Sequence, residues 1–154
     1  MTKQGTIWWT ELQSRDPDKA RAFYKKVIGW KPFVAAMGNM GRKAKPGEPS
    51  YTIFSVGDQQ ACGAFKMEGP EMEGVPPHWF TYIAVDNVDK TCGKVEKAGG
   101  RVMRPPFDIP GVGRIAIIQD PEGAMVGLGT PAPTAKPAKR KAAKRKAAKG
   151  KRKK

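Results

Sequence analysis

The sequence predicts an α+β fold in which two β-α-β-β-β modules form one curved mixed sheet around a cleft, followed by a disordered basic tail. Three observations predict it. The stretch WWTELQSRDPDK at Trp8 recurs as WFTYIAVDNVDK at Trp79, and the gapless match covers residues 8–33 and 79–104. Two further strand-like runs follow each copy. Residues 131–154 hold twelve Lys or Arg and no acid, which is typical of a solvated polycation.

Each copy of the repeat begins with an aromatic-rich strand and continues into a helix of about eleven residues. In the first copy Ser14 or Asp16 can cap the helix, and Pro17 suits its first turn. In the second copy Asn87 takes the capping position. Apolar residues then recur at helical spacing, and glycine ends each helix. These apolar residues are Ala20, Phe23, Tyr24 and Val27 in the first helix and Val88, Cys92, Val95 and Ala98 in the second.

The strands that complete the modules are YTIFSV and QACGAFKM after the first helix, and GRIAIIQ and AMVGLG after the second. We therefore predict one domain over residues 1–130, with modules at about 5–67 and 76–130, and a tail over 131–154. Residues 35–50 read as a Gly-, Lys- and Pro-rich loop, which is either a lid carrying basic side chains or a solvated loop. Residues 103–114 contain two proline turns that should hold Phe107 and Ile109 in place.

Composition places the excess charge in the tail. The chain has a formal net charge of +15, but residues 1–130 hold 17 basic and 14 acidic side chains. No run of residues resembles a signal peptide or a membrane span. Cys62 and Cys92 have no motif spacing, so we predict two buried thiols in a reducing cytosol.

The stretches WTELQSRDPDKARAFYKKVIGW and RPPFDIPGVGRIAIIQDPEGAMVGL, together with the repeat at Trp79, closely resemble the glyoxalase, bleomycin-resistance and extradiol-dioxygenase superfamily, the vicinal oxygen chelate fold. Within it they look most like a branch related to the mycobacterial CFP-30B antigen. The resemblance covers about residues 5–132 and implies paired β-α-β-β-β modules. It implies no single reaction, because this scaffold hosts many.

The resemblance also implies where a divalent metal would sit in catalytic members: one ligand on the first strand and one on the last strand of each module. Counting from the helix caps and from the DPEG turn places these positions at Trp9, Gly63, Phe80 and Gly127. None of these side chains is a nitrogen, oxygen or sulfur ligand of the kind that metals require. We therefore predict no metal and no other cofactor.

Strand alternation predicts which residues line the cleft instead. An aromatic-walled pocket with a few polar groups suits a flat or apolar small molecule. The predicted ligand-binding residues are Trp9, Glu11, Phe65, His78, Phe80, Tyr82 and Met125. The opposite strand faces, with Trp8, Leu12, Ile83, Val85, Val126 and Leu128, should pack under the helices.

Each candidate has a structural alternative. Trp9 and Phe80 either stack on a ligand or close the space between the modules as core. Glu11 is either a buried general base or a carboxylate paired with a basic group or backbone N–H groups. His78 and Tyr82 are further weak catalytic candidates, since His78 can simply be solvated at a strand start and Tyr82 can simply pack. We find no nucleophile in a recognisable catalytic setting.

The tail predicts a nucleic-acid partner, because lysine and arginine without interleaved aromatics contact phosphates and do not read bases. Acidic proteins, polyphosphate or anionic lipid would satisfy the same electrostatics, and a solubilising tail is the other alternative. The predicted contact residues are Lys139, Arg140, Lys141, Lys144, Arg145, Lys146, Lys149, Lys151, Arg152, Lys153 and Lys154.

Three functions follow as hypotheses. The first is a metal-independent domain that binds a small apolar or aromatic molecule and is tethered to nucleic acid by its tail. The second is a lyase, isomerase or dioxygenase of the same superfamily. The third is a nucleoid-associated protein whose folded body serves as a packing or dimerising module. All three imply a cytoplasmic protein without membrane insertion, nucleoid-associated if the tail binds DNA, and leave open whether the modules pair within one chain or across a homodimer.

Overall fold

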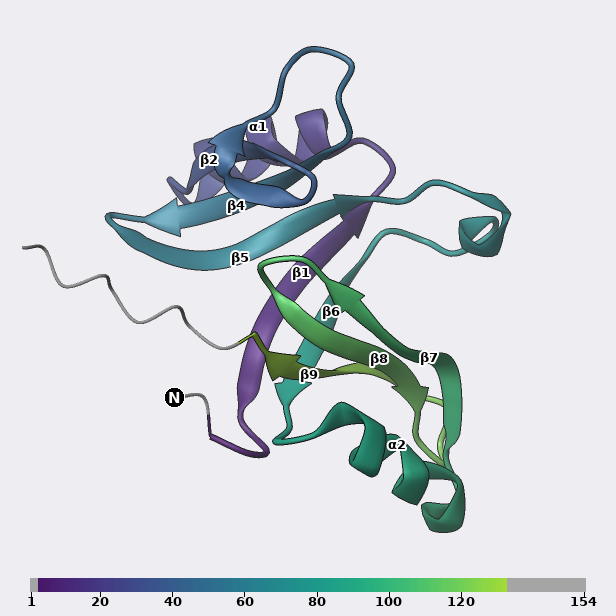
Figure 1. The fold of residues 1–154 in the computed structure, drawn as a ribbon. Coiled ribbons are helices and arrows are strands. Elements are labelled where there is room, and N and C mark those ends of the chain that lie inside the picture. The colour runs from purple at the N-terminus through teal and green to yellow at the C-terminus, as the bar shows by residue number, and fades with distance from the viewer. Residues whose placement is uncertain (1–2, 133–154) are drawn as a thin grey trace, which may run out of the picture.

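The two copies of the repeat meet at the centre of one nine-stranded mixed sheet, and the predicted α+β fold class is confirmed (Figure 1). The computed structural model describes residues 3–132, so the predicted tail lies outside the described residues apart from its first two positions. The strand order is β3-β2-β4-β5-β1-β6-β9-β8-β7. The first module comprises β1 (Ile7–Ser14), α1 (Pro17–Val27), β2 (Lys31–Ala36), β3 (Asn39–Lys43), β4 (Ser50–Val56) and β5 (Gln59–Lys66).

The second module repeats this arrangement after a connection that contains one turn of 3-10 helix, η1 (Pro70–Met72). It comprises β6 (His78–Ala84), α2 (Val88–Val95) with a 3-10 extension η2 (Glu96–Ala98), β7 (Arg101–Ile109), β8 (Gly113–Gln119) and β9 (Met125–Pro131). The last strand of each module pairs in parallel with the first, β5 with β1 and β9 with β6. Within the described residues, no helix has the length and apolar character that crossing a bilayer requires.

The modules are joined by antiparallel pairing of β1 with β6 inside one chain. Thr10 lies opposite Thr81, its own equivalent in the repeat, with Trp9 opposite Tyr82 and Glu11 opposite Phe80. A local two-fold axis therefore passes through the Thr10–Thr81 pair. Because β1 and β6 are central strands, the side chains around this axis come from both modules at once.

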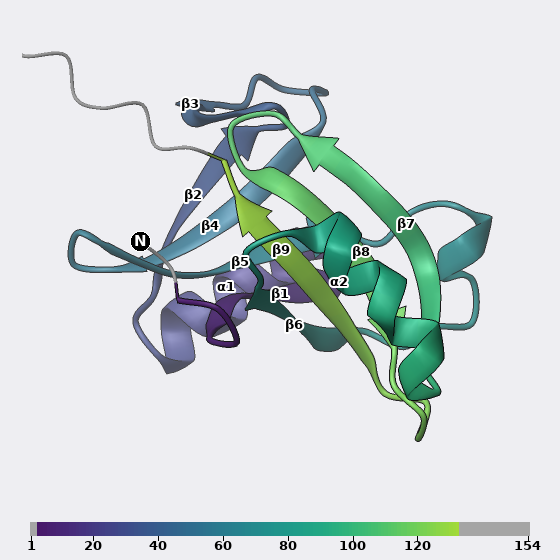
Figure 2. The ribbon, with the colours of Figure 1, turned by 60° about the horizontal axis from the view of Figure 1, so that its bottom comes forward.

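Each helix covers an apolar core on one face of the sheet, as the alternation predicts. Under α1, Leu12, Phe54, Cys62 and Ala64 are buried, with Ala20, Tyr24 and Trp30 packed against them. Under α2, which Figure 2 shows alongside β8 and β9, the buried residues are Val85, Val88, Cys92, Ala116 and Leu128. Cys62 and Cys92 are buried free thiols, as predicted.

The helix caps follow the sequence. The Asp16 carboxylate accepts a hydrogen bond from the Lys19 backbone N–H at 3.0 Å, and the Asn87 side chain accepts one from the Lys90 N–H at 2.8 Å. These bonds satisfy backbone donors that the first helical turn leaves unpaired. The DPEG turn is held in the same way, because Asp120 accepts hydrogen bonds from two backbone N–H groups within the turn.

Two expectations about the fold are wrong. Residues 35–50 are not a plain loop, because β3 pairs there with β2 and forms an edge hairpin. Trp8 does not pack under the helices. A register shift in β1 between Ile7 and Trp9 turns Trp8 to the other face, where it lies over Gly129 and joins an apolar cluster with Trp9, Phe80 and Tyr82. A bulge of this kind adds a residue and so breaks the alternation on which the expectation depended.

Candidate functional site

The face of the sheet opposite the two helical cores carries an apolar cluster, called here the central cluster. Phe80, Tyr82 and Ile115 are its buried members, and Trp8, Trp9, Phe107, Ile109 and Ile117 pack against them. Its members come from β1 and β6 at the module junction and from β7 and β8. Phe107 and Ile109 pack against this cluster. Of the two expected proline turns, Pro110 lies in the turn between β7 and β8, whereas Pro105 and Pro106 lie within strand β7. The structure thus brings Trp9, Phe80 and Tyr82 together.

Glu11 lies beside the central cluster, between two tyrosines. The Tyr82 hydroxyl donates to one carboxylate oxygen at 2.9 Å, and the Tyr51 hydroxyl donates to the other at 2.8 Å. The Trp9 indole N–H in turn donates to the Tyr51 hydroxyl oxygen at 2.8 Å. Glu11 is only 8% exposed. Four residues from β1, β4 and β6 therefore form one hydrogen-bonded chain across the module junction.

Burial controls the ionisation of this chain. Loss of hydration raises the pKa of Glu11 above its ordinary value, although the hydrogen bonds from Tyr51, Tyr82 and Gln13 act in the opposite direction. Burial and the nearby Glu11 carboxylate raise the pKa values of both Tyr51 and Tyr82, so both hydroxyls stay protonated and remain donors. Of the two structural roles expected for Glu11, pairing with a basic group is not observed, since none of the ion pairs among residues 3–132 includes it.

The raised pKa of Glu11 makes stability depend on pH in a defined direction. Between the unfolded and folded pKa values the folded state binds more protons than the unfolded state, so this group makes folding less favourable as pH rises. Glu11→Gln removes the titration but keeps the hydrogen bonds, because its amide can accept from Tyr51 and donate to Tyr82. We expect the variant to gain stability relative to the parent protein as pH rises from 4 towards 8. Urea unfolding of both proteins across this range checks it; a constant difference would contradict it.

Glycine at two positions makes room for the tyrosines. A Cβ atom at Gly63 would overlap the hydroxyl end of the Tyr51 ring, and a Cβ at Gly127 would overlap the Tyr82 ring near its attachment. Tyr82 lies directly opposite Gly127 in the β6–β9 pairing. The predicted open floor of the cleft is therefore filled by the protein's own aromatic rings.

The residues at the counted ligand positions do not fit a divalent metal. Trp9 and Phe80 bring rings to the junction, and the space next to Gly63 and Gly127 holds the two tyrosines. Across residues 3–132, no three or more His, Cys, Asp or Glu side chains gather where they could hold an ion. Glu11 is a lone carboxylate, so this donor set lacks the three or four ligands of protein metal sites.

The other predicted ligand-binding residues lie at the margins. Phe65 is half-buried and pairs with Gln13 across β5 and β1. The His78 ring contacts the Pro76 carbonyl at 2.9 Å and lies edge-on to Phe80, at 6.2 Å between ring centroids. Met125 is 44% exposed at the start of β9 and is not part of the central cluster. The eleven predicted tail contacts lie outside the described residues.

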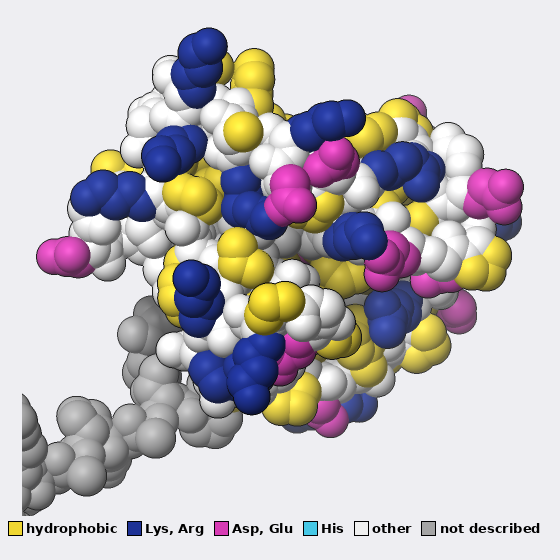
Figure 3. All heavy atoms as spheres, turned by 90° about the horizontal axis from the view of Figure 1, so that it is seen from above, with side chains coloured by type: hydrophobic (Ala, Val, Ile, Leu, Met, Phe, Trp, Pro, Cys, Tyr) yellow, Lys and Arg dark blue, Asp and Glu magenta, His cyan; other side chains and the backbone are white. Residues whose placement is uncertain are grey.

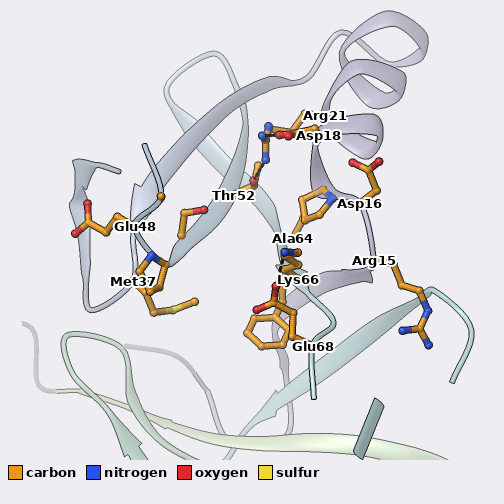
Figure 4. A pocket seen from close by; sticks show the side chains of 15 residues that line it. Arg15, Asp16, Asp18, Arg21, Met37, Glu48, Thr52, Ala64, Lys66 and Glu68 are labelled. Atoms are coloured by element: carbon orange, nitrogen blue, oxygen red, sulfur yellow. Dashed lines mark hydrogen bonds and ion pairs between the residues drawn. The ribbon is translucent and has the colours of Figure 1, made fainter. Parts of the chain in front are cut away.

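Two adjoining cavities open elsewhere, beside the N-terminus of α1 and the 44–50 loop, and Figure 4 shows the first of them. Their volumes are about 650 and 730 Å³. Both polar and apolar groups line them, and Arg21 lies in both walls, donating to the Thr52 hydroxyl at 2.9 Å and pairing with Asp18. Phe65 is the single predicted ligand-binding residue in either wall. This part of the first module was not foreseen as a site.

Sequence reasoning missed Tyr51, the residue that links Trp9 to Glu11. A signal for it was present. Tyr51 shares a strand face with Ile53, which lies opposite Gly63 in the β4–β5 pairing. A large ring diagonal to a glycine on a neighbouring strand is a packing complement. Tyr51 and Gly63 form such a diagonal pair in the first module, and in the second module Tyr82 packs on Gly127, which lies directly opposite it.

This arrangement of two β-α-β-β-β modules agrees with the comparisons to known proteins. The chain belongs to the glyoxalase/bleomycin resistance protein/dioxygenase superfamily, whose family model matches residues 6–128. It is 38% identical over 133 residues to CFP32 of Mycobacterium tuberculosis, covering 86% of this chain and 47% of CFP32. It is 31% identical over 135 residues to the anthracycline biosynthesis protein DnrV of Streptomyces peucetius, covering 80% of this chain and 46% of DnrV.

This chain thus spans about half the length of these curated relatives. Among solved structures, methylmalonyl-CoA epimerase from Mycobacterium tuberculosis superposes with a TM-score of 0.55 at 17% identity, covering 84% of this chain and 89% of the epimerase. A likeness at that identity concerns the fold. The family model and the sequence identities therefore confirm the predicted family.

Proposed function

We propose that this protein is a metal-independent member of its superfamily that binds a small, largely apolar or aromatic molecule on the central cluster. The observation that carries the proposal is the hydrogen-bonded chain from Trp9 through Tyr51 and Glu11 to Tyr82, set in an aromatic wall where catalytic relatives would hold a metal. Aromatic walls with a few fixed polar groups favour flat apolar ligands that need one or two hydrogen bonds for orientation. The half-buried rings of Trp9 and Phe107 offer the contact surface.

Binding of 1-naphthalenemethanol, followed by tryptophan fluorescence and calorimetry, tests the proposal. Trp9→Leu removes a stacking ring and the hydrogen bond to Tyr51, so we expect about tenfold weaker binding. Trp79→Phe is the matched control, because Trp79 lies among Tyr24 and Trp30 on the helix side of the sheet. Treatment with a chelator should leave affinity unchanged. Equal binding by the Trp9 and Trp79 variants, or loss of binding on chelation, would overturn the proposal.

The second candidate is an enzyme of the same superfamily, and the raised pKa of Glu11 is what favours it. A general base works best when its pKa approaches the working pH. Glu11 would then act with Tyr82, whose hydroxyl contacts it, and His78 would stand at the edge of the cluster. Turnover of glyoxalase- or catechol-type substrates, with and without added divalent metal, separates this candidate from the first.

We propose further that the tail at residues 131–154 binds nucleic acid through its phosphates. The charge of the folded part supports a polyanionic partner. Residues 3–67 hold eleven Lys and Arg against five Asp and Glu, whereas residues 68–130 hold six against nine. Figure 3 shows the molecule from the end where the first module lies, and basic side chains are spread over this surface with acidic ones between them. Phosphate backbones attract such a surface at any sequence.

A further inference from the structure

We propose that the molecule bound at the central cluster is an organic cation, an aromatic or alkyl amine whose ammonium group pairs with Glu11. The inference depends on the proposed function, since it specifies the ligand class for that same site. Among the described residues, Glu11 is the one acidic or basic side chain that is buried, and it lies beside the central cluster. Glu11 is 8% exposed, and the side chains that hydrogen-bond to it, Tyr51, Tyr82 and Gln13, are all neutral.

A buried carboxylate without a cation is costly. Removing an ion from water costs several kcal/mol after relaxation, and hydrogen bonds from two neutral hydroxyls offset part of this cost. The ion pairs among residues 3–132 use Asp16, Asp18, Glu48, Glu68, Asp89 and Asp108 as their acids. All six of these pairs are at exposed or half-exposed positions, whereas the buried Glu11 is left without one. Seven exposed acids among residues 3–132 also lack an ion pair, but water surrounds them, whereas the buried Glu11 has neither bulk water nor a cation beside it.

The carboxylate retains room to accept. Each oxygen of a carboxylate has two lone pairs, and each oxygen of Glu11 accepts one tyrosine hydroxyl. An ammonium group has three donors and can use the remaining acceptor sites. Other residues hold both tyrosine side chains in place. The Trp9 indole N–H donates to the Tyr51 hydroxyl, and the Tyr82 ring packs against Gly127. The acceptors are thus held in place before a ligand arrives, which lowers the cost of binding.

The walls also suit a cation. Trp9, Phe80 and Tyr82 are aromatic, and the faces of aromatic rings attract positive charge. The protein already uses this attraction at the margin of the same cluster, where the Arg104 guanidinium lies 3.8 Å from the centroid of the Phe107 ring. Arg104 pairs with no acid among the described residues and makes no hydrogen bond to Glu11. A neutral ligand would leave Glu11 unpaired, and an anionic ligand would be repelled by it.

The experiment uses three probes with one ring system at neutral pH: 1-naphthylmethylamine, 1-naphthalenemethanol and 1-naphthoate. We expect the amine to bind the parent protein about 10- to 100-fold more tightly than the alcohol, the range that a charge-assisted hydrogen bond supplies. The naphthoate should bind most weakly. In Glu11→Gln the preference for the amine over the alcohol should disappear. Circular dichroism confirms that the variant is folded.

The outcomes separate the two proposals. If the alcohol binds as well as the amine and Glu11→Gln changes neither, the cation inference is overturned and apolar binding stands. If no probe binds, both proposals fail. Tyr51→Phe offers an independent check, because it keeps the carboxylate and removes one of its hydrogen bonds. The preference for the amine should persist or grow in that variant, because the freed carboxylate oxygen can accept a further hydrogen bond from the ammonium group. If the preference is lost, Glu11 is not its source.

Discussion

A chain that ends at Pro131 is expected to lose most of its affinity for nucleic acid. The deleted tail carries twelve of the 29 basic residues and no acid. On duplex DNA each neutralised phosphate adds about −0.9 to the slope of log affinity against log salt. If only half of the tail's basic residues contact phosphate, truncation should reduce the slope by about 5, which means that the full chain loses roughly a thousandfold more affinity than the truncated chain between about 50 and 200 mM salt. Titration of a mixed-sequence duplex at several salt concentrations measures both quantities.

A neutral tail of the same length provides the matched control for this truncation. Replacing the eleven predicted contact residues and Lys136 by Gln keeps the chain length and removes all twelve positive charges, so this variant should bind as weakly as the truncated chain. The surplus of basic residues in the first module predicts a small residual slope in both variants. An unchanged slope after truncation would show that the tail contributes no phosphate contacts, and the nucleic-acid proposal would then be wrong.

The module architecture follows from the sequence because the repeat is gapless. The repeat maps Thr10 onto Thr81. If the two equivalent strands pair about a two-fold axis through these threonines, a residue just before Thr10 must lie opposite the residue just after Thr81, and the reverse. The structure shows this, with Trp9 opposite Tyr82 and Glu11 opposite Phe80. The alternation of side chains then places Leu12 in a helical core and Glu11 on the other face.

The sequence could not predict features that depend on three-dimensional packing. The shift in β1 that moves Trp8 breaks the period on which strand reasoning depends. The role of Tyr51 depends on a diagonal approach between β4 and β1, which are not neighbours in the sheet. The helices also differ despite the repeat. No residue of α1 is buried, while α2 buries Val88, Cys92 and Val95, and the two apolar stripes look alike in sequence.

Among the Gly→Ala substitutions at Gly63, Gly93 and Gly127, the one at Gly127 is expected to destabilise the protein most. The new Cβ would meet the Tyr82 ring close to Cγ, the ring atom attached to the side chain's own Cβ, so bending at the far end of the side chain cannot relieve the overlap. The ring must leave its position, and its hydroxyl then withdraws from the buried Glu11 carboxylate. Overpacking of this kind costs about 1–3 kcal/mol, and we expect a fall in Tm of roughly 5–10 °C.

Two further Gly→Ala variants make this result interpretable. Gly63→Ala meets the hydroxyl end of Tyr51, which can swing aside, so it should cost less stability than Gly127→Ala while breaking the link between Trp9 and Glu11. Gly93 lies within α2 with no atom near an added Cβ, so Gly93→Ala should raise stability by about 0.5–1 kcal/mol. If tyrosine rings fill the space beside the counted ligand positions, Tm should be highest for Gly93→Ala, lower for Gly63→Ala and lowest for Gly127→Ala. If Gly127→Ala melts with the parent protein, the space beside β9 is open, and a site for an ion or a larger ligand would have to be placed there.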